Sequence, residues 1–135
     1  MVFVDSSAFV ALLDADDPLH RQAVEFWHGG LRARTRFVST NYVVVECAAA
    51  VQRRLGNSAF AAFANRILPA TSQEWVTPED HNAALESVLA ADRRRLSWVD
   101  CVSFTVMRRL GIDACFTIDR HFGEQGFTVV PEQTG

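Results

Sequence analysis

Four carboxylates stand in or beside apolar stretches where folding alone does not call for a negative charge. Asp5 directly follows three apolar residues, and Asp119 follows the mostly apolar run 114–118. Glu46 lies within a long uncharged stretch, and Asp100 opens another. Burying an unpaired carboxylate costs several kcal/mol, so such residues are usually neutralised by a partner or a cation. The pattern suggests a metal-dependent nuclease.

The chemistry open to these side chains depends on what neutralises them. Oxygen ligands select hard ions, so Mg²⁺ is expected, with Mn²⁺ as a substitute. One or two such ions would lower the pKa of a bound water and stabilise the charge that develops during in-line attack on a phosphodiester. The four histidines are scattered without ligand spacing, so we expect them at the surface; they are His20, His28, His81 and His121. Because the chain also has no lysine, we expect the metal, and not a side chain acting as general base, to generate the nucleophile.

Each acid also has a purely structural interpretation. Asp5 could begin a cap for the helix that follows it, and Asp119 could be a turn residue after a strand. Asp100 lies three residues after Ser97 and could complete a capping box. Glu46 has no local role in the middle of a helix, so its main alternative is a buried arginine partner. These alternatives explain the acids one at a time, whereas one metal site explains all four.

The segments that must position these acids alternate between strand-like and helical patterns. Strands are expected at residues 2–5, 36–39, 74–76, 114–118 and 127–130. Helices are expected at 7–14, from Pro18 with Asp17 as N-cap, from the cap Thr40 to 55, at 58–68, at 78–95, and from the cap Ser97 to 110. This order predicts an α/β fold with a mostly parallel central sheet of four to five strands and helices on both faces.

The predicted sheet brings the acids toward one edge. In open parallel sheets, ligands bind beyond the carboxyl ends of the strands, and Asp5 and Asp119 each fall where a predicted strand ends. Asp100, in the first turn of its helix, could point to the same edge. So could Glu46, about two turns into a helix that is apolar nearly all round and is therefore expected to be buried.

Composition narrows the class of protein. With 135 residues, 49% of them hydrophobic and 21% charged, the chain fits one globular domain over 1–135. We expect no membrane association and a cytoplasmic location, because no apolar run approaches the roughly 18 residues that span a bilayer and the N-terminus lacks a signal-peptide pattern. Three cysteines without close spacing, Cys47, Cys101 and Cys115, are expected to be buried thiols.

The basic and aromatic residues leave their roles open. All 13 basic residues are arginines, and ten of them cluster at 32/34/36, 53–54, 93–95 and 108–109. Arginine binds phosphate well, but a chain without lysine can equally reflect the base composition of its genome. The net charge of −3 argues against nonspecific coating of nucleic acid. The tryptophans Trp27, Trp75 and Trp98 are expected in the core rather than stacked on bases.

Four blocks of sequence, in order, resemble the PIN-domain ribonucleases, and most of all the VapC toxins of bacterial toxin–antitoxin pairs. The blocks are 2–9 around Asp5, the apolar helix that carries Glu46, 96–111 around Asp100, and 116–122 around Asp119 with 126–127. The resemblance covers nearly the whole chain.

The resemblance implies a PIN-like fold and a Mg²⁺-dependent endoribonuclease that cuts structured RNA, with Asp5, Glu46, Asp100 and Asp119 holding the metal. Ser7 and Thr117 match the small hydroxyl positions of the family beside the acids, as hydrogen-bond partners. It also implies a homodimer and a cognate VapB-type antitoxin. Two rival classes stay open: a PIN fold that binds RNA or protein without cutting it, and a metal-dependent phosphoesterase that acts on DNA or a small phosphate ester.

Overall fold

Five parallel strands form the central sheet in the computed structural model, which describes residues 1–92 and 94–132. In chain order they are β1 (Val2–Val4), β2 (Phe37–Thr40), β3 (Thr71–Glu74), β4 (Ala114–Phe116) and β5 (Thr128–Val130). Across the sheet the order is β3-β2-β1-β4-β5, so β1 is central, and Val2 is in register with both Phe37 and Ala114. The predicted α/β class and parallel sheet are confirmed.

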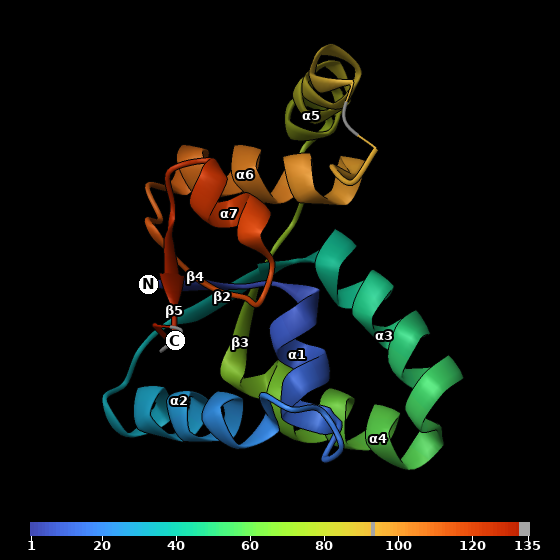
Figure 1. Cartoon of the computed structure of the whole chain (residues 1–135), viewed down its shortest axis with the longest axis vertical. Coiled ribbons are helices and arrows are strands. Elements are labelled where there is room, and N and C mark those ends of the chain that lie inside the picture. The colour runs from blue at the N-terminus through green and yellow to red at the C-terminus, as the bar shows by residue number, and fades with distance from the viewer. Residues whose placement is uncertain (93, 133–135) are drawn as a thin grey trace.

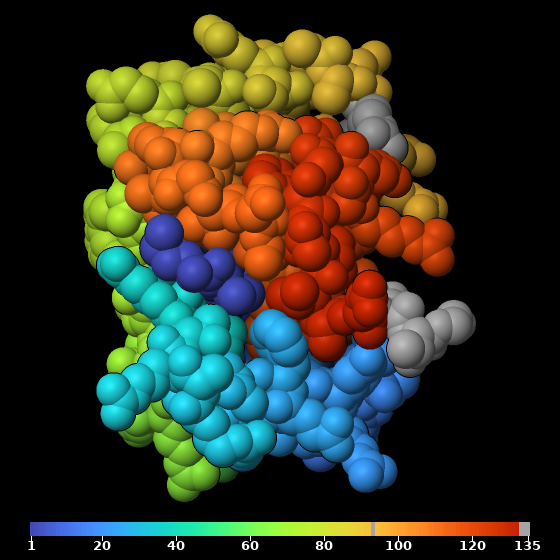
Figure 2. Space-filling model, turned by 90° about the vertical axis from the view of Figure 1, so that its left-hand side faces the viewer, coloured from blue at the N-terminus to red at the C-terminus, as the bar shows by residue number. Residues whose placement is uncertain are grey.

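Helices connect successive strands. α1 (Ser6–Leu13) and α2 (His20–Arg32) follow β1; α3 (Asn41–Leu55), α4 (Asn57–Ala62), the π-helical η1 (Phe63–Ile67) and the 3₁₀ turn η2 (Leu68–Ala70) follow β2; α5 (Pro78–Ala91) and α6 (Trp98–Leu110) follow β3; α7 (Arg120–Glu124) follows β4. Figure 1 shows α6 and α7 on one side of the sheet and α1 and α2 on the other. The side view in Figure 2 has α5 at one end of the molecule and α2 near the other. Within the described ranges, no helix has the length and apolarity needed to cross a membrane.

Aromatic side chains fix the central strands against the helices. Phe3, Phe37 and Phe116, one from each of the three central strands, are at most 1% exposed. Trp27 of α2 stacks on Phe37 with ring centroids 4.3 Å apart. The prediction that Trp27 lies in the core is confirmed. A Cβ at Gly30 would overlap the ring of Phe37, so only glycine lets α2 approach β2 this closely. The strand that leads to Asp5 is thus held in a packed frame.

Several predicted exposures are wrong. α3 is buried on one side only: Val44 and Cys47 face the core, whereas Val45 is 68% exposed and Glu46 is also exposed. The reason is that α3 projects from the edge of the fold, and its outer side is not covered by any described element (Figure 1). Trp75 and Trp98 are likewise exposed rather than in the core. The prediction for the cysteines is confirmed, since all three are free and buried.

Some predicted boundaries also shift, each for a local reason. The second helix begins at His20 rather than Pro18, because the Asp17 side chain accepts from the Leu19 N–H and holds a turn there. The third strand ends at Glu74, and the N–H of Val76 bonds the side chain of Asn41 instead of a strand.

The long helix predicted over 78–95 ends at Ala91, where Asp92 adopts a left-handed conformation with φ of 48°. Arg93, which belongs to both that predicted helix and the predicted arginine cluster, lies outside the described residues. The fourth strand ends at Phe116 rather than 118, and the short helix α7 was not predicted. Asp119 therefore precedes a helix instead of ending a strand.

Candidate metal centre

Asp5 is a buried carboxylate that no described cation neutralises. It occupies the N-cap position of α1, yet its side chain makes no capping bond, so the capping interpretation is wrong. Its Oδ2 accepts hydrogen bonds from Ser7 Oγ at 2.9 Å and Thr117 Oγ1 at 3.0 Å, and the residue is 5% exposed. Burial raises the pKa of Asp5 to about 6, although the two hydroxyl groups favour the charged form. The fold thus keeps an anion in a poorly solvated place.

Ser7 and Thr117 tie Asp5 to the loop that carries Asp119. The two hydroxyl oxygens lie 3.1 Å apart, Ser7 Oγ accepts from the N–H of Ile118 at 3.0 Å, and Thr117 Oγ1 accepts from the N–H of Asp119 at 2.9 Å. Because β1 and β4 are adjacent strands, residues more than 100 positions apart in sequence meet here. The network holds the end of β1 and the start of the β4–α7 loop in one arrangement.

Asp100 combines a structural role with a place in the site. Its N–H bonds Ser97 Oγ at 3.0 Å, and its Oδ2 accepts from the N–H of Ser97 at 3.2 Å, so the capping box of the alternative interpretation is present. Its Oδ1 has no hydrogen-bond partner in residues 1–92 and 94–132. Burial raises the pKa of Asp100, and the neighbouring charge of Asp119 raises it further. The cap therefore aims the side chain without neutralising it.

Glu46 joins the site from the opposite side, on α3. Ser6 Oγ donates to its Oε1 at 3.3 Å, and no arginine of the described chain contacts it, so the buried-arginine interpretation is wrong. Although one side of the residue is exposed, partial burial raises its pKa, and the charge of Asp100 adds to this effect. Asp100 likewise raises the pKa of Asp5, so Asp100 is the common electrostatic neighbour of all three other acids.

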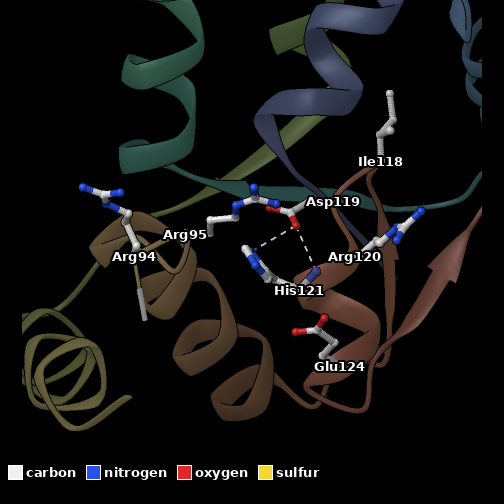
Figure 3. A pocket seen from close by; sticks show the side chains of 7 residues that line it. All are labelled: Arg94, Arg95, Ile118, Asp119, Arg120, His121 and Glu124. Atoms are coloured by element: carbon white, nitrogen blue, oxygen red, sulfur yellow. Dashed lines mark hydrogen bonds and ion pairs between the residues drawn. The ribbon is translucent and has the colours of Figure 1, made fainter. Parts of the chain in front are cut away.

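Asp119 caps the short helix α7 and brings a histidine with it. Its Oδ1 accepts from the N–H of His121 at 2.9 Å, so Asp119 is the N-cap of a helix rather than the ordinary turn residue of the alternative interpretation. The His121 side chain is 16% exposed, and its Nδ1 lies 3.2 Å from Asp119 Oδ1 and 3.9 Å from Asp100 Oδ2 (Figure 3). Both distances are short enough for an ion pair, but the buried Nδ1 forms no hydrogen bond with either carboxylate. The prediction of His121 as a surface residue is wrong.

The donor atoms suit a divalent cation. One oxygen each from Asp100 and Asp119 and one ring nitrogen of His121 lie within 4.8 Å of one another, a spacing that a single ion can bridge. Asp5 and Glu46 supply further carboxylates without cationic partners among the described residues. Carboxylates alone favour Mg²⁺, whereas an imidazole nearby also suits Mn²⁺. A bound cation would balance the negative charge of the carboxylates and give the buried Nδ1 of His121 a partner.

Comparisons with known proteins show which family and which solved structures this chain is similar to. Residues 2–127 match the family described as the PIN domain. Over 132 residues the chain is 36% identical to the 23S rRNA-specific endonuclease VapC20 of Mycobacterium tuberculosis, covering 96% of this chain and 98% of that protein. The crystal structure of the same VapC20, titled a sarcin–ricin loop cleaving toxin, superimposes with a TM-score of 0.84 and 32% identity, over 95% of this chain and 97% of that one. A Pyrobaculum aerophilum structure, at a TM-score of 0.66 and 18% identity over 96% of this chain and 88% of its own, shows the fold alone.

Proposed function

The chain belongs to the PIN-domain family and, within it, to the VapC endoribonucleases, and we propose that Asp5, Glu46, Asp100 and Asp119 hold the divalent metal ion on which RNA hydrolysis depends. Mg²⁺ is the proposed ion, with Mn²⁺ as a substitute. The observation that carries the proposal is the buried Asp5 carboxylate, which has Asp100 as a charged neighbour and no cationic partner among the described residues.

Each side chain has a distinct part in this proposal. When bound, the metal ion supplies an activated water and positive charge for in-line displacement at phosphorus. Ser7 and Thr117 keep the Asp5 carboxylate charged and fixed in direction through their hydrogen bonds to Oδ2. Ser97 fixes Asp100 through the capping box, and the start of α7 fixes Asp119 and His121. These contacts preorganise the site before RNA arrives.

The substrate that we propose is structured RNA. The relative that covers nearly the whole chain is named for 23S rRNA, and its crystal structure for the sarcin–ricin loop, so this loop is the first RNA to test. We place the activity in the cytoplasm, where ribosomal RNA is found. The three free, buried cysteines fit a reducing compartment.

We further propose a VapB-type antitoxin and a homodimer as the assemblies of this protein. A partner bound on α3 would cover Val45, which adjoins Glu46 and is 68% exposed. The exposed Trp75 and Trp98 supply further apolar area near the start of α6 and the end of β3.

The test is cleavage of a sarcin–ricin loop RNA, and of DNA of the same sequence, by purified antitoxin-free protein in Mg²⁺. We expect RNA alone to be cut, because recognition of the 2′-hydroxyl separates the two polymers. Asp5→Asn and Asp100→Asn should lower the rate by about 100-fold or more, about 3 kcal/mol of lost transition-state stabilisation. Asp16→Asn, at an exposed acid outside the site, is the matched control and should cut normally.

A second readout does not depend on activity. Mn²⁺ should raise the melting temperature of the wild type and of Asp16→Asn, because a ligand that binds only the folded state stabilises it, and should have little effect on Asp5→Asn. Equal cutting by all variants would identify a contaminating nuclease. A folded protein that neither cuts RNA nor responds to Mn²⁺ would contradict the proposed function.

A further inference from the structure

An open pocket of about 670 Å³ adjoins the acidic site. Its lining includes Asp119 and His121, which also belong to the candidate metal centre, and three arginines, Arg94, Arg95 and Arg120 (Figure 3). Two of the arginines precede α6 and the third is the first residue of α7. A molecule in this pocket therefore contacts guanidinium groups and the acidic site at the same time.

These three arginines differ from Arg108 and Arg109, which follow on α6, in having no partner among the described residues. Arg109 binds Asp80 and Glu74, and Arg108 binds Gln125 and covers the ring of Phe127. By contrast, the three pocket arginines are exposed and form no ion pair or hydrogen bond within residues 1–92 and 94–132. Folding therefore does not require their charge, and their guanidinium groups are available to a ligand.

Their placement suits a polyanion that passes over the acids. In Figure 3, Arg94 and Arg95 lie on one side of Asp119 and His121, and Arg120 lies on the other. The site itself repels phosphate, since its carboxylates are negative and even a bound divalent ion offsets only part of that charge. Guanidinium groups on both sides reduce the repulsion and match phosphate oxygens with paired N–H donors.

We propose that Arg94 and Arg95 on one side, and Arg120 on the other, bind the backbone phosphates that flank the scissile phosphodiester, so that the RNA strand crosses Asp119. This inference rests on the proposed ribonuclease function and adds the path of the substrate. The contacts are to phosphate, so they position the strand without reading its bases.

The experiment measures binding of a fluorescently labelled sarcin–ricin loop RNA by anisotropy, in an Asp5→Asn background that does not cut. Arg95→Gln and Arg120→Gln should each weaken binding about fivefold or more, and should lower the slope of log affinity against log salt by about 0.7, the value for one single-strand phosphate contact. The triple variant with Arg94→Gln should lose about two units of slope. Arg21→Gln, on α2 with a side chain 92% exposed, is the matched control and should change neither quantity.

Shortening the RNA from each end tests the two-sided arrangement. When nucleotides are removed on one side of the cut, Arg95→Gln should no longer weaken RNA binding, whereas Arg120→Gln still should. Removing nucleotides on the other side should give the reverse result. Melting temperatures of the variants should stay close to the parent, because exposed, unpaired side chains contribute little to stability.

The outcomes separate this inference from the proposed function. RNA binding and salt slopes unchanged in the arginine variants, with wild-type protein that cuts RNA, would overturn the phosphate path alone. Effects that vanish together when either end is shortened would overturn the two-sided arrangement. A wild type that neither binds nor cuts RNA would overturn both the function and the path.

Discussion

Two buried carboxylates of this chain, Asp5 and Asp80, have opposite surroundings. Asp80, in the first turn of α5, is 3% exposed and receives two hydrogen bonds from Arg109, at 3.1 Å from Nε and 2.8 Å from Nη2. Asp5 is 5% exposed and receives hydrogen bonds from hydroxyl groups. Burial by itself raises the pKa of both, but Arg109 and Thr77 reverse the effect at Asp80, whose pKa is lowered overall. The pKa of Asp5 stays raised, at about 6.

The difference shows what separates a structural acid from a functional one in this fold. Asp80 and Arg109 form a finished pair, in which each ion is the main partner of the other. Asp5 is oriented by Ser7 and Thr117 but keeps a negative charge that folding leaves uncompensated. Burial alone would not distinguish the two acids; the presence or absence of a cationic partner does.

The largest effect on stability is expected from breaking the finished pair. Arg109→Leu leaves the buried Asp80 carboxylate without its cation, and should lower the free energy of unfolding by about 3 kcal/mol, or the melting temperature by about 10 °C. Calorimetry at pH 7 measures the change. Arg108→Leu is the neighbouring control and should cost less than about 1 kcal/mol, because its contacts are to Gln125 and the ring of Phe127. Equal losses in both variants would show that Asp80 does not depend on its pair.

Neutralising Asp5 should raise the free energy of unfolding of the metal-free protein rather than lower it. Its pKa rises from 3.8 to about 6 on folding, so the folded state binds the proton more tightly, and metal-free protein loses stability as the pH rises through this window. In EDTA, Asp5→Asn should therefore be more stable than wild type by about 2 kcal/mol at pH 7 and equal to it near pH 4. Asp80→Asn, at the paired acid, should be less stable than wild type at pH 7. Denaturant titrations at both pH values would contradict the comparison if the two variants shifted in the same direction.

The smallest effect is expected from removing one of the two hydroxyl groups that bond Asp5. Thr117→Val keeps the shape of the buried side chain but removes the donor to Asp5 and the acceptor for the N–H of Asp119. Mn²⁺ affinity should fall about tenfold, about 1.4 kcal/mol, as is typical when the partner of a metal-binding side chain is lost. Thr117→Ser restores the hydroxyl and should restore most of the affinity in a calorimetric titration. An affinity unchanged in Thr117→Val would mean that Ser7 alone orients Asp5.

Local patterns predicted much of this molecule. The parallel sheet follows from alternating strands and helices, and the capping box of α6 follows from the spacing of Ser97 and Asp100. The end of α6 at Gly111, which has a φ of 69°, follows from its freedom to adopt that conformation. In each case the residues that determine the structure are neighbours in sequence.

The parts that escaped prediction depend on distant residues or on short elements. Arg109 and Asp80 are 29 positions apart, and no local sequence pattern predicts that they pair. α7 has five residues, too few to show a helical period, so the approach of His121 to Asp119 could not be foreseen. A histidine two residues after a capping acid is the one local signal that could have drawn attention to it. Exposure of α3 depends on which elements cover it, which periodicity does not reveal.

The central position of β1 determines when this protein can become active. Asp5 is synthesised before residues 116 and 117, but its N–H bonds the carbonyl of Phe116, and Thr117 supplies one of its two hydroxyl partners. An incomplete chain that lacks β4 therefore has neither the neighbour of β1 nor Asp119. We therefore expect a prematurely ended product to be inactive, because β1 would have no partner strand on that side and the site would lack Asp119. For a protein that degrades RNA, this order of assembly confines the hazard to finished molecules.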